Sequence, residues 1–164
     1  MKILVFSDTH RKYDKMYEII NEHKNTANLV IHLGDLQSDV EKVMIDFPQI
    51  PFLSVAGNCD VFQGSIFEKH YYTFNFESHK ILITHGHMFN VRNNLYSLLN
   101  IANKEGCDIA LYGHTHIAKH LKIGNVDFFN PGSITEPRDY TNGTFGIINI
   151  EKNKTEFLIK EIDK

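Results

Sequence analysis

Two features of the sequence predict an α/β protein. Over the first two-thirds of its 164 residues, short apolar segments alternate with amphipathic segments, a pattern typical of strands followed by helices. From about residue 120 the helical pattern disappears, and short β-type segments follow one another with turn residues between them. Strand–helix alternation favours parallel strands and hairpins add antiparallel ones, so we expect at least one mixed sheet. Propensity alone leaves open whether there are one or two sheets.

The first half of the chain is expected to hold three strands and two helices. Ser38 and Glu41 resemble a capping box that opens the second helix, and Pro48 would end it. The strands span residues 3–6, 29–33 and 51–55, and the first helix spans about 12–24. The residues expected to face the core are Met16, Ile19 and Ile20 in the first helix and Val40, Val43, Met44 and Phe47 in the second.

The second half is expected to be richer in strands. Residues 61–69 read as a loop or a short helical turn. One further helix is expected over 93–104, with Gly106 as its C-terminal stop. The strands are expected at residues 71–76, 80–84, 109–112, 121–123, 126–129, 145–150 and 156–162.

The composition argues against several classes of protein. Seventeen basic and 20 acidic residues give a net charge of −3, and no run of Lys or Arg suggests a dedicated nucleic-acid or membrane surface. No segment approaches the ~20 apolar residues of a transmembrane helix, and the N-terminal apolar run is too short for a signal peptide. The two cysteines form neither a disulfide framework nor a CxxC pair. We therefore expect a single domain over residues 1–164, located in the reducing cytoplasm.

Polar residues gather where five of the expected strands end. Each of these strands runs directly into a short segment containing Asp, Asn or His. Ligands bind at the carboxyl edge of open α/β sheets, so side chains at this edge are expected to converge. The residues concerned are Asp8, His10, Asp35, Asn58, Cys59, His85, His87, His114 and His116.

Taken singly, each cluster has an ordinary alternative. Residues two apart in an extended chain point the same way, so Asp8 with His10, or His114 with His116, either clamps one ion or forms a hydrogen-bonded turn. The Gly-Asp and Gly-Asn pairs alone would be turns. Taken together, two carboxylates, an amide and several imidazoles suit divalent ions such as Mn, Fe, Zn or Ni. The glycines allow backbone and ligand to approach closely.

These motifs resemble those of the calcineurin-like metallophosphoesterases, in the same order and on the same strand ends. The resemblance runs from the first strand to about Gly132, and residues 130–133 and 137–138 are similar to the small bacterial and archaeal phosphodiesterase branch. The family fold is a four-layer αββα sandwich, with two mixed β-sheets face to face flanked by helices. The motifs are Asp8-x-His10, Gly34-Asp35, Gly57-Asn58-x-Asp60, His85 and Gly113-His114-x-His116.

The resemblance implies two divalent metal ions and hydrolysis of a phosphate ester. Two ions ~3.5–4 Å apart can clamp an in-line displacement, and a hydroxide that bridges them is the expected nucleophile. Mn²⁺ is the first expectation, with Ni²⁺, Fe²⁺ and Zn²⁺ as alternatives. Carried over by motif, the first ion is held by Asp8, His10 and His116, the second by Asn58, His85 and His114, and both by Asp35.

The expected substrate is a small phosphodiester, because the branch implies it and the sequence shows no clear Arg/Lys clamp for a dianionic monoester. The alternative within enzymes is a phosphomonoesterase or nucleotide phosphatase. The rival from another class is a protein-binding scaffold, since a eukaryotic sorting-complex subunit resembles this fold. A scaffold is free to lose metal ligands, whereas all seven positions here hold ligand-type residues. Family members often form homodimers or larger homo-oligomers, so the resemblance allows either.

One position departs from the wider family. Many members have a histidine after the Asn of the Gly-Asn motif, and that histidine usually donates a proton to the leaving group. This chain has Cys59 there, as the small phosphodiesterase branch often does. A thiol with an ordinary pKa of ~8.5 is one candidate donor. The alternatives are His87 and water.

Three residues outside the motifs carry their own expectations. His32 lies inside an apolar strand and is expected to be a hydrogen-bonded core residue. His79 lies in a polar context and is expected to be exposed. Arg138 either reaches a substrate phosphate or forms a surface salt bridge.

Overall fold

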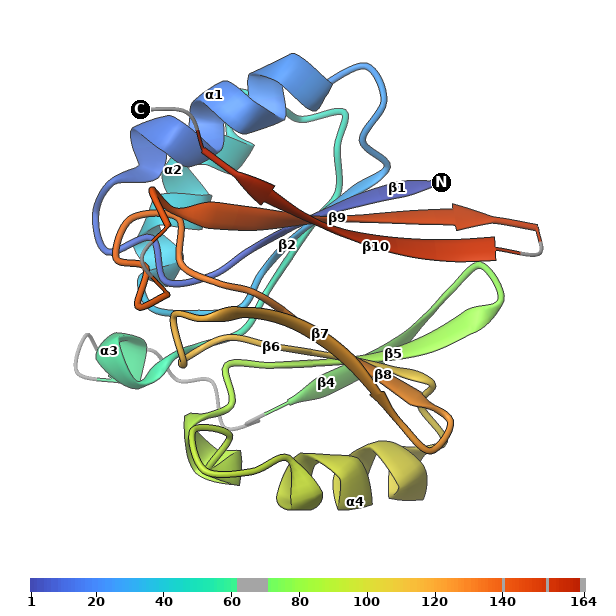
Figure 1. Cartoon of the computed structure of the whole chain (residues 1–164). Coiled ribbons are helices and arrows are strands. Elements are labelled where there is room, and N and C mark those ends of the chain that lie inside the picture. The colour runs from blue at the N-terminus through green and yellow to red at the C-terminus, as the bar shows by residue number, and fades with distance from the viewer. Residues whose placement is uncertain (62–70, 140, 153, 163–164) are drawn as a thin grey trace.

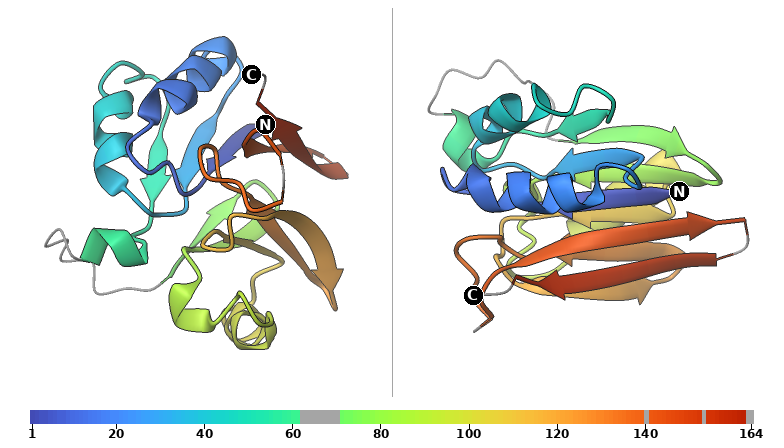
Figure 2. Two further views of the ribbon diagram at one scale, coloured as in Figure 1. Left: turned by 60° about the vertical axis from the view of Figure 1, so that its left-hand side comes forward. Right: turned by 90° about the horizontal axis from the view of Figure 1, so that it is seen from above.

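The computed structural model describes residues 1–61, 71–139, 141–152 and 154–162. Two five-stranded mixed sheets pack face to face, and helices cover their outer faces (Figure 1). Helices α1 and α2 lie on the first sheet and α4 lies on the second, as the turned views in Figure 2 also show. The four-layer α/β sandwich implied by the resemblance is therefore confirmed.

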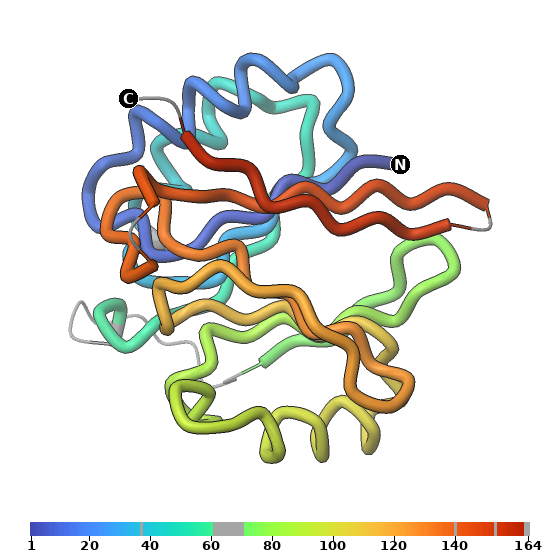
Figure 3. The backbone as a smooth tube through the Cα atoms, in the orientation of Figure 1, coloured from blue at the N-terminus to red at the C-terminus, as the bar shows by residue number. Residues whose placement is uncertain are grey.

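The first sheet has its three parallel strands at one edge and an antiparallel hairpin at the other. β1, β2 and β3 run parallel, β9 pairs antiparallel with β1, and β10 pairs antiparallel with β9. The backbone tube in Figure 3 shows this C-terminal hairpin lying beside the N-terminal strand. In sheet order the strands are β10 (Lys154–Glu161), β9 (Thr144–Glu151), β1 (Lys2–Phe6), β2 (Leu29–His32) and β3 (Phe52–Ser54).

The second sheet has three parallel strands in its centre and an antiparallel strand at each edge. β5, β6 and β8 run parallel, β4 pairs antiparallel with β5, and β7 pairs antiparallel with β8. In sheet order the strands are β4 (Tyr72–Phe76), β5 (His79–Thr84), β6 (Ile109–Tyr112), β8 (Val126–Pro131) and β7 (Ala118–Ile123).

Three apolar clusters hold the four layers together. Ile3 and Val5 point into the cluster between the two sheets, whereas Leu4 and Phe6 point into the cluster under α1 and α2. A third cluster lies between the second sheet and α4 and includes Leu98. Because successive side chains of a strand point to opposite faces, a strand covered on both sides must be apolar throughout. This explains the unbroken apolar run over residues 3–6.

The helices agree in number with the expectation, apart from two short turns. The helices are α1 (Tyr13–His23), α2 (Gln37–Met44), α3 (Asn58–Val61), a 3-10 turn η1 (His87–Phe89) and α4 (Tyr96–Glu105). Gly106 caps α4 in the left-handed conformation with φ 68°, as expected for a glycine stop. The expected loop at 61–69 lies, beyond Val61, outside the described residues. Among the described residues, no helix has the length and hydrophobicity needed to cross a membrane.

The capping box predicted for α2 is wrong. The helix begins at Gln37, so Ser38 already lies inside its first turn, and no side chain caps the helix. Leu36, just before it, has φ 97°, because the chain turns sharply after Asp35. Met44, expected in the core, is 44% exposed. α2 also ends at Met44, before the Pro48 stop that the sequence suggested.

Candidate metal centre

The parallel strands of both sheets end on the same side of the molecule, on the left in Figure 1. Strands from both sheets therefore deliver polar residues to one place at the seam between the sheets. Asp8 and His10 follow β1, Asp35 follows β2, Asn58 opens α3 after β3, His85 follows β5, and His114 and His116 follow β6.

Asp8, His10 and His116 form the first cluster. Nε2 of His116 lies 3.1 Å from Oδ1 of Asp8 and 3.5 Å from Nε2 of His10. Nδ1 of His116 lies 2.7 Å from the backbone oxygen of Glu136. A carbonyl oxygen only accepts, so the ring hydrogen sits on Nδ1 and Nε2 presents its lone pair to the cluster when the ring is neutral.

Asn58, His85 and His114 form the second cluster. Nε2 of His85 lies 3.2 Å from Oδ1 of Asn58 and 3.2 Å from Nδ1 of His114. Nδ1 of His85 donates to the backbone oxygen of Leu33 at 2.7 Å. As with His116, this hydrogen bond turns the unprotonated Nε2 towards its neighbours.

Asp35 lies between the two clusters. Its Oδ1 lies 3.6 Å from Nε2 of His85 and accepts a hydrogen bond from the backbone nitrogen of Cys59 at 2.9 Å. Ligand atoms of Asp8, Asp35 and His85 lie within 4.8 Å of one another, and so do those of His10, Asp35 and Cys59. One carboxylate is thus within reach of both clusters, which is the position that the predicted bridging role requires.

The residues present fit a divalent cation. Oδ1 of Asp8 is buried and accepts no hydrogen bond from any described residue, although Nε2 of His116 lies 3.1 Å from it. The lone pair of His85 faces a second acceptor, the oxygen of Asn58. Buried acceptors that converge in this way cost free energy unless a cation or a proton lies between them. The centre therefore has the donor chemistry and the electrostatic need for a bound metal.

Mutual interactions shift pKa values within the centre. Burial raises the pKa of Asp8, but the adjacent imidazole of His116 and that of His85 outweigh this and lower it to about 2. Burial lowers the pKa of His114 to about 4, with help from the charges of His85 and Arg92. Burial also lowers the pKa of His116, but the adjacent carboxylate of Asp8 raises it above its ordinary value.

The backbone at these residues adopts an unusual, left-handed conformation. Most of the expected ligands have positive φ, a conformation that residues other than glycine seldom adopt and that concentrates at functional sites. The extended-chain argument for pairing His114 with His116 is therefore wrong, because these two residues join different clusters. The values of φ are 56° at Asp8, 45° at His10, 58° at Asp35, 67° at His114 and 60° at His116.

Two of the motif glycines are required by close approach. A Cβ on Gly57 would lie 2.1 Å from Oδ1 of Asp35, and one on Gly113 would lie 2.0 Å from Oγ of Ser7. Both contacts are far inside van der Waals distance, so any larger residue would displace the turns that hold the expected ligands.

Two buried carboxylates support the centre, and sequence reasoning gave neither a role. Oδ2 of Asp39 accepts hydrogen bonds from Oγ1 of Thr9 at 2.8 Å and from the backbone nitrogen of Arg11 at 2.9 Å. Asp60 appeared in a motif, and its Oδ2 accepts the backbone amides of Asp35 and Gly57. Asp39 lies in the first turn of α2, where no sequence pattern distinguishes it from a surface acid.

The two candidate proton donors lie at different edges of the centre. Cys59 is half-buried beside Asp35, and burial together with nearby carboxylates raises the pKa of its thiol to about 11. His87, in the turn η1, has its ring centroid 5.3 Å from that of His85 and 6.1 Å from that of His114. Neither arrangement by itself selects the donor.

The other expectations for single residues had mixed outcomes. His32 is fully buried and hydrogen-bonded, as predicted: its Nδ1 accepts from the backbone nitrogen of Gly34. His79 is not the exposed residue expected, because Asp108 and Thr155 each lie 2.6 Å from one of its ring nitrogens. Arg138 is exposed and forms no ion pair with a described residue, so the salt-bridge alternative is wrong.

Comparison with known proteins agrees with the family resemblance of the motifs. The calcineurin-like phosphoesterase superfamily domain matches residues 1–153. The probable metallophosphoesterase YsnB of Bacillus subtilis is 31% identical over 153 residues, covering 93% of this chain and 86% of that protein. The phosphodiesterase MJ0936 of Methanocaldococcus jannaschii is 29% identical over 179 residues, covering 98% of this chain and all of that protein.

Solved structures share the fold. A conserved protein of Streptococcus pneumoniae TIGR4, described as a predicted phosphoesterase, superposes with a TM-score of 0.80 at 27% identity, covering 98% of this chain and 88% of that one. A single mutant of Vps29 from Entamoeba histolytica superposes with a TM-score of 0.72 at 18% identity, covering 99% of this chain and 100% of that one. At that identity the likeness to Vps29 concerns the fold alone.

Proposed function

The chain belongs to the calcineurin-like phosphoesterase superfamily, and from this premise we propose that it hydrolyses phosphodiesters with two divalent metal ions. The observation that carries the proposal is the arrangement of acceptors: two clusters of side chains face one another, and the carboxylate of Asp35 lies within reach of both. A single structural cation would not require two clusters of this kind.

The proposed ligand assignment follows the geometry. Asp8, His10 and His116 would hold one ion, Asn58, His85 and His114 the other, and Asp35 both. When bound, two ions at these residues would supply Lewis acidity for the phosphoryl oxygens and would make water a stronger nucleophile near neutral pH. Mn²⁺ remains our first choice of metal.

The protein itself fixes the orientation of the histidine rings and the charge of the centre. The hydrogen bonds from Nδ1 of His85 and of His116 to backbone oxygens set both tautomers in advance, so the rings need no reorganisation when an ion binds. Asn58 contributes a neutral oxygen, which limits the negative charge facing an anionic substrate. Cys59 is placed beside Asp35, and His87 beside His85, so either can be tested as proton donor.

The preference for diesters rests on relatives. One of the proteins it resembles is described as a phosphodiesterase and matches nearly the whole chain. The sequence argument that the chain lacks a cationic clamp no longer supports this preference, because Arg92 and Arg138 line a pocket beside the His114–His116 turn.

The experiment is a substrate and metal panel. Bis(4-nitrophenyl) phosphate and 4-nitrophenyl phosphate are assayed with Mn²⁺, Ni²⁺, Fe²⁺, Zn²⁺ and no metal, and we expect metal-dependent turnover with the higher kcat/KM on the diester. Higher kcat/KM on the monoester would favour the phosphomonoesterase alternative. Absence of turnover on both with every metal would overturn the proposal and favour a binding protein.

A further inference from the structure

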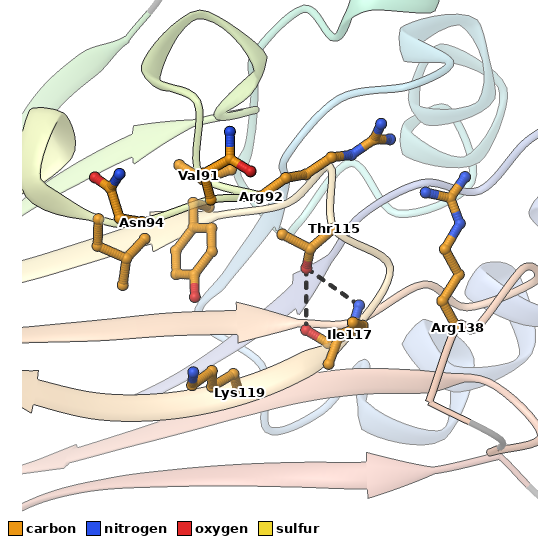
Figure 4. Close-up of a pocket in the computed structure, with 10 residues that line it drawn as sticks. Val91, Arg92, Asn94, Thr115, Ile117, Lys119 and Arg138 are labelled. Atoms are coloured by element: carbon orange, nitrogen blue, oxygen red, sulfur yellow. Dashed lines mark hydrogen bonds between the residues drawn. The ribbon is translucent and has the colours of Figure 1, made fainter.

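A pocket lies against the turn that carries His114 and His116. Its volume is about 400 Å³, within the range of small-ligand sites. Thr115, which lies between the two histidines in sequence, lines the pocket (Figure 4). One turn thus presents two imidazoles to the metal centre and the residue between them to the pocket, so a ligand in the pocket would adjoin the metal centre.

Three cationic side chains line the pocket, and no acidic side chain does. In Figure 4 the guanidinium groups of Arg92 and Arg138 extend to the same side of the Thr115–Ile117 turn, and Lys119 lies on the other side of the pocket. All three are exposed, and none forms an ion pair with any residue in the described part of the chain. On a protein with a net charge of −3, this is a local concentration of uncompensated positive charge.

Both arginines are anchored to the turn itself. Nη2 of Arg92 donates to the backbone oxygen of His114 at 3.3 Å. The backbone nitrogen of Arg138 donates to the backbone oxygen of His116 at 2.9 Å. The guanidinium of Arg92 and the backbone of Arg138 therefore keep a defined position relative to the expected metal ligands, although 46 residues separate the two arginines in sequence.

The remaining lining is largely apolar or uncharged. Val91 and Tyr112 are buried, Leu95 is half-buried, and Ile117 is 43% exposed. A ligand that fills the pocket can therefore bury a short organic segment while an anionic end reaches the arginines. Guanidinium groups suit phosphate in particular, because their donors match two of its oxygens.

We propose that this pocket binds a second phosphate of the substrate, carried on one of the two groups esterified to the scissile phosphate. The substrate class is then phosphodiesters that bear a further phosphate. This inference rests on the proposed function, which supplies the diester at the metal centre.

The test compares two substrates with the same scissile bond. One is 4-nitrophenyl propyl phosphate, and the other carries an additional phosphate at the end of its propyl group. For the wild type with Mn²⁺ we expect kcat/KM to be at least about tenfold higher for the phosphate-bearing substrate, the factor of one charge-assisted hydrogen bond. Because both substrates have the same scissile bond, a change in the metal centre alters both kcat/KM values and cancels in their ratio.

The variants distinguish an effect of the pocket on kcat/KM from an effect of the overall charge of the protein. Arg138→Gln removes a guanidinium that has no hydrogen bond or ion pair to a described residue, and it should bring the ratio of the two kcat/KM values towards one. Arg92→Gln is the second variant. Lys122→Gln is the matched control, because Lys122 is exposed on the same strand as Lys119 but lies outside the pocket lining, and it should keep the wild-type ratio.

A ratio near one in the wild type, or a ratio that neither arginine variant changes, would overturn the inference. Hydrolysis of neither substrate by the wild type would instead count against the proposed function. In that event, titration calorimetry with the intact phosphate-bearing diester tests the pocket directly. Binding that weakens about tenfold in Arg138→Gln supports the pocket, and equal or absent binding overturns it.

Discussion

The backbone amide of Asp35 donates to Oδ2 of Asp60 at 3.1 Å, which ties the turn after β2 to the start of α3. The same oxygen accepts the amide of Gly57 at 2.7 Å. Asp60 is 2% exposed, so its carboxylate is buried beneath the turn that carries Asp35. These two hydrogen bonds help to fix the turn that places the carboxylate of Asp35.

Asp60→Ala should weaken both folding and metal binding. Each of the two buried amides left without an acceptor costs about 1–3 kcal/mol, and loss of such support typically lowers metal affinity ~10–100-fold. Asp60→Asn keeps an oxygen at this position and is the matched control, with smaller losses of both. Denaturant unfolding and titration with Mn²⁺ measure the two effects. If Asp60→Ala bound Mn²⁺ as tightly as the wild type, the supporting role would be refuted.

Removal of divalent metal should abolish hydrolysis of bis(4-nitrophenyl) phosphate, and Mn²⁺ should restore it. Metal should also stabilise the fold, since a ligand at 100 times its Kd adds ~2.7 kcal/mol if it binds only the native state. At ~2–4 °C per kcal/mol, Tm should rise by about 5–10 °C. The reference for both the activity and Tm is the protein in Mg²⁺-free buffer that contains chelator. Full turnover after chelation, verified by metal analysis, would contradict the mechanism.

Asp35→Ala should be more damaging than His10→Ala. The first change removes the side chain within reach of both clusters and leaves two cations less screened from one another, whereas the second leaves the cluster of Asn58, His85 and His114 complete. We expect the lower kcat and the lower metal content in Asp35→Ala, measured by steady-state assay and by metal analysis after dialysis. The opposite ranking would show that Asp35 does not bridge.

Cys59→Ser tests the proton donor through leaving groups. If the thiol donates, esters with alkoxide leaving groups should lose far more rate than nitrophenyl esters, because nitrophenolate is already stable near pH 7. General acid catalysis contributes ~10²–10⁴-fold, so the selective loss is readily measured. Cys59→His would place the common family residue there and should improve poor leaving groups if the ring fits.

Equal losses for both ester types in Cys59→Ser would mean that the thiol packs the turn and donates no proton. His87→Ala with the same pair of esters then becomes the decisive comparison. Selective loss for alkoxide esters in that variant would assign the role to His87, and equal losses in both variants would leave water as the donor.

His32 should make the fold sensitive to mild acid. Burial lowers its pKa to about 4 from an ordinary value near 6.5, so between these values the unfolded chain binds a proton that the folded protein does not. The free energy of unfolding should therefore fall as pH decreases from 6.5 to 4, with up to about 3 kcal/mol due to His32. His32→Asn keeps an acceptor for the backbone nitrogen of Gly34. It should remove the contribution of His32 to the pH dependence of the free energy of unfolding. Urea unfolding of both proteins across this range measures it, and identical pH dependences would contradict the assignment.

The sequence alone was sufficient to predict most of the strands and helices and the gathering of ligand-type residues. Strands buried on both faces, such as residues 3–6, must be apolar throughout, so a break into Asp8 or a Gly-Asp pair marks the end of each strand without knowledge of the fold. The place of His32 followed in the same way, because an imidazole inside such a strand has to find hydrogen bonds in the core.

Only the tertiary structure decided which side chains meet. His114 and His116 separate into different clusters because the backbone at both is left-handed, a conformation imposed by packing rather than by local propensity. The Ser38 capping box failed for a related reason, since the turn that places Asp35 shifts the start of α2. Arg92 and Arg138 come from segments with no common pattern, and they line the same pocket because each hydrogen-bonds to the His114–His116 turn. Such contacts depend on the approach of distant segments in three dimensions, and no periodicity along the chain records that approach.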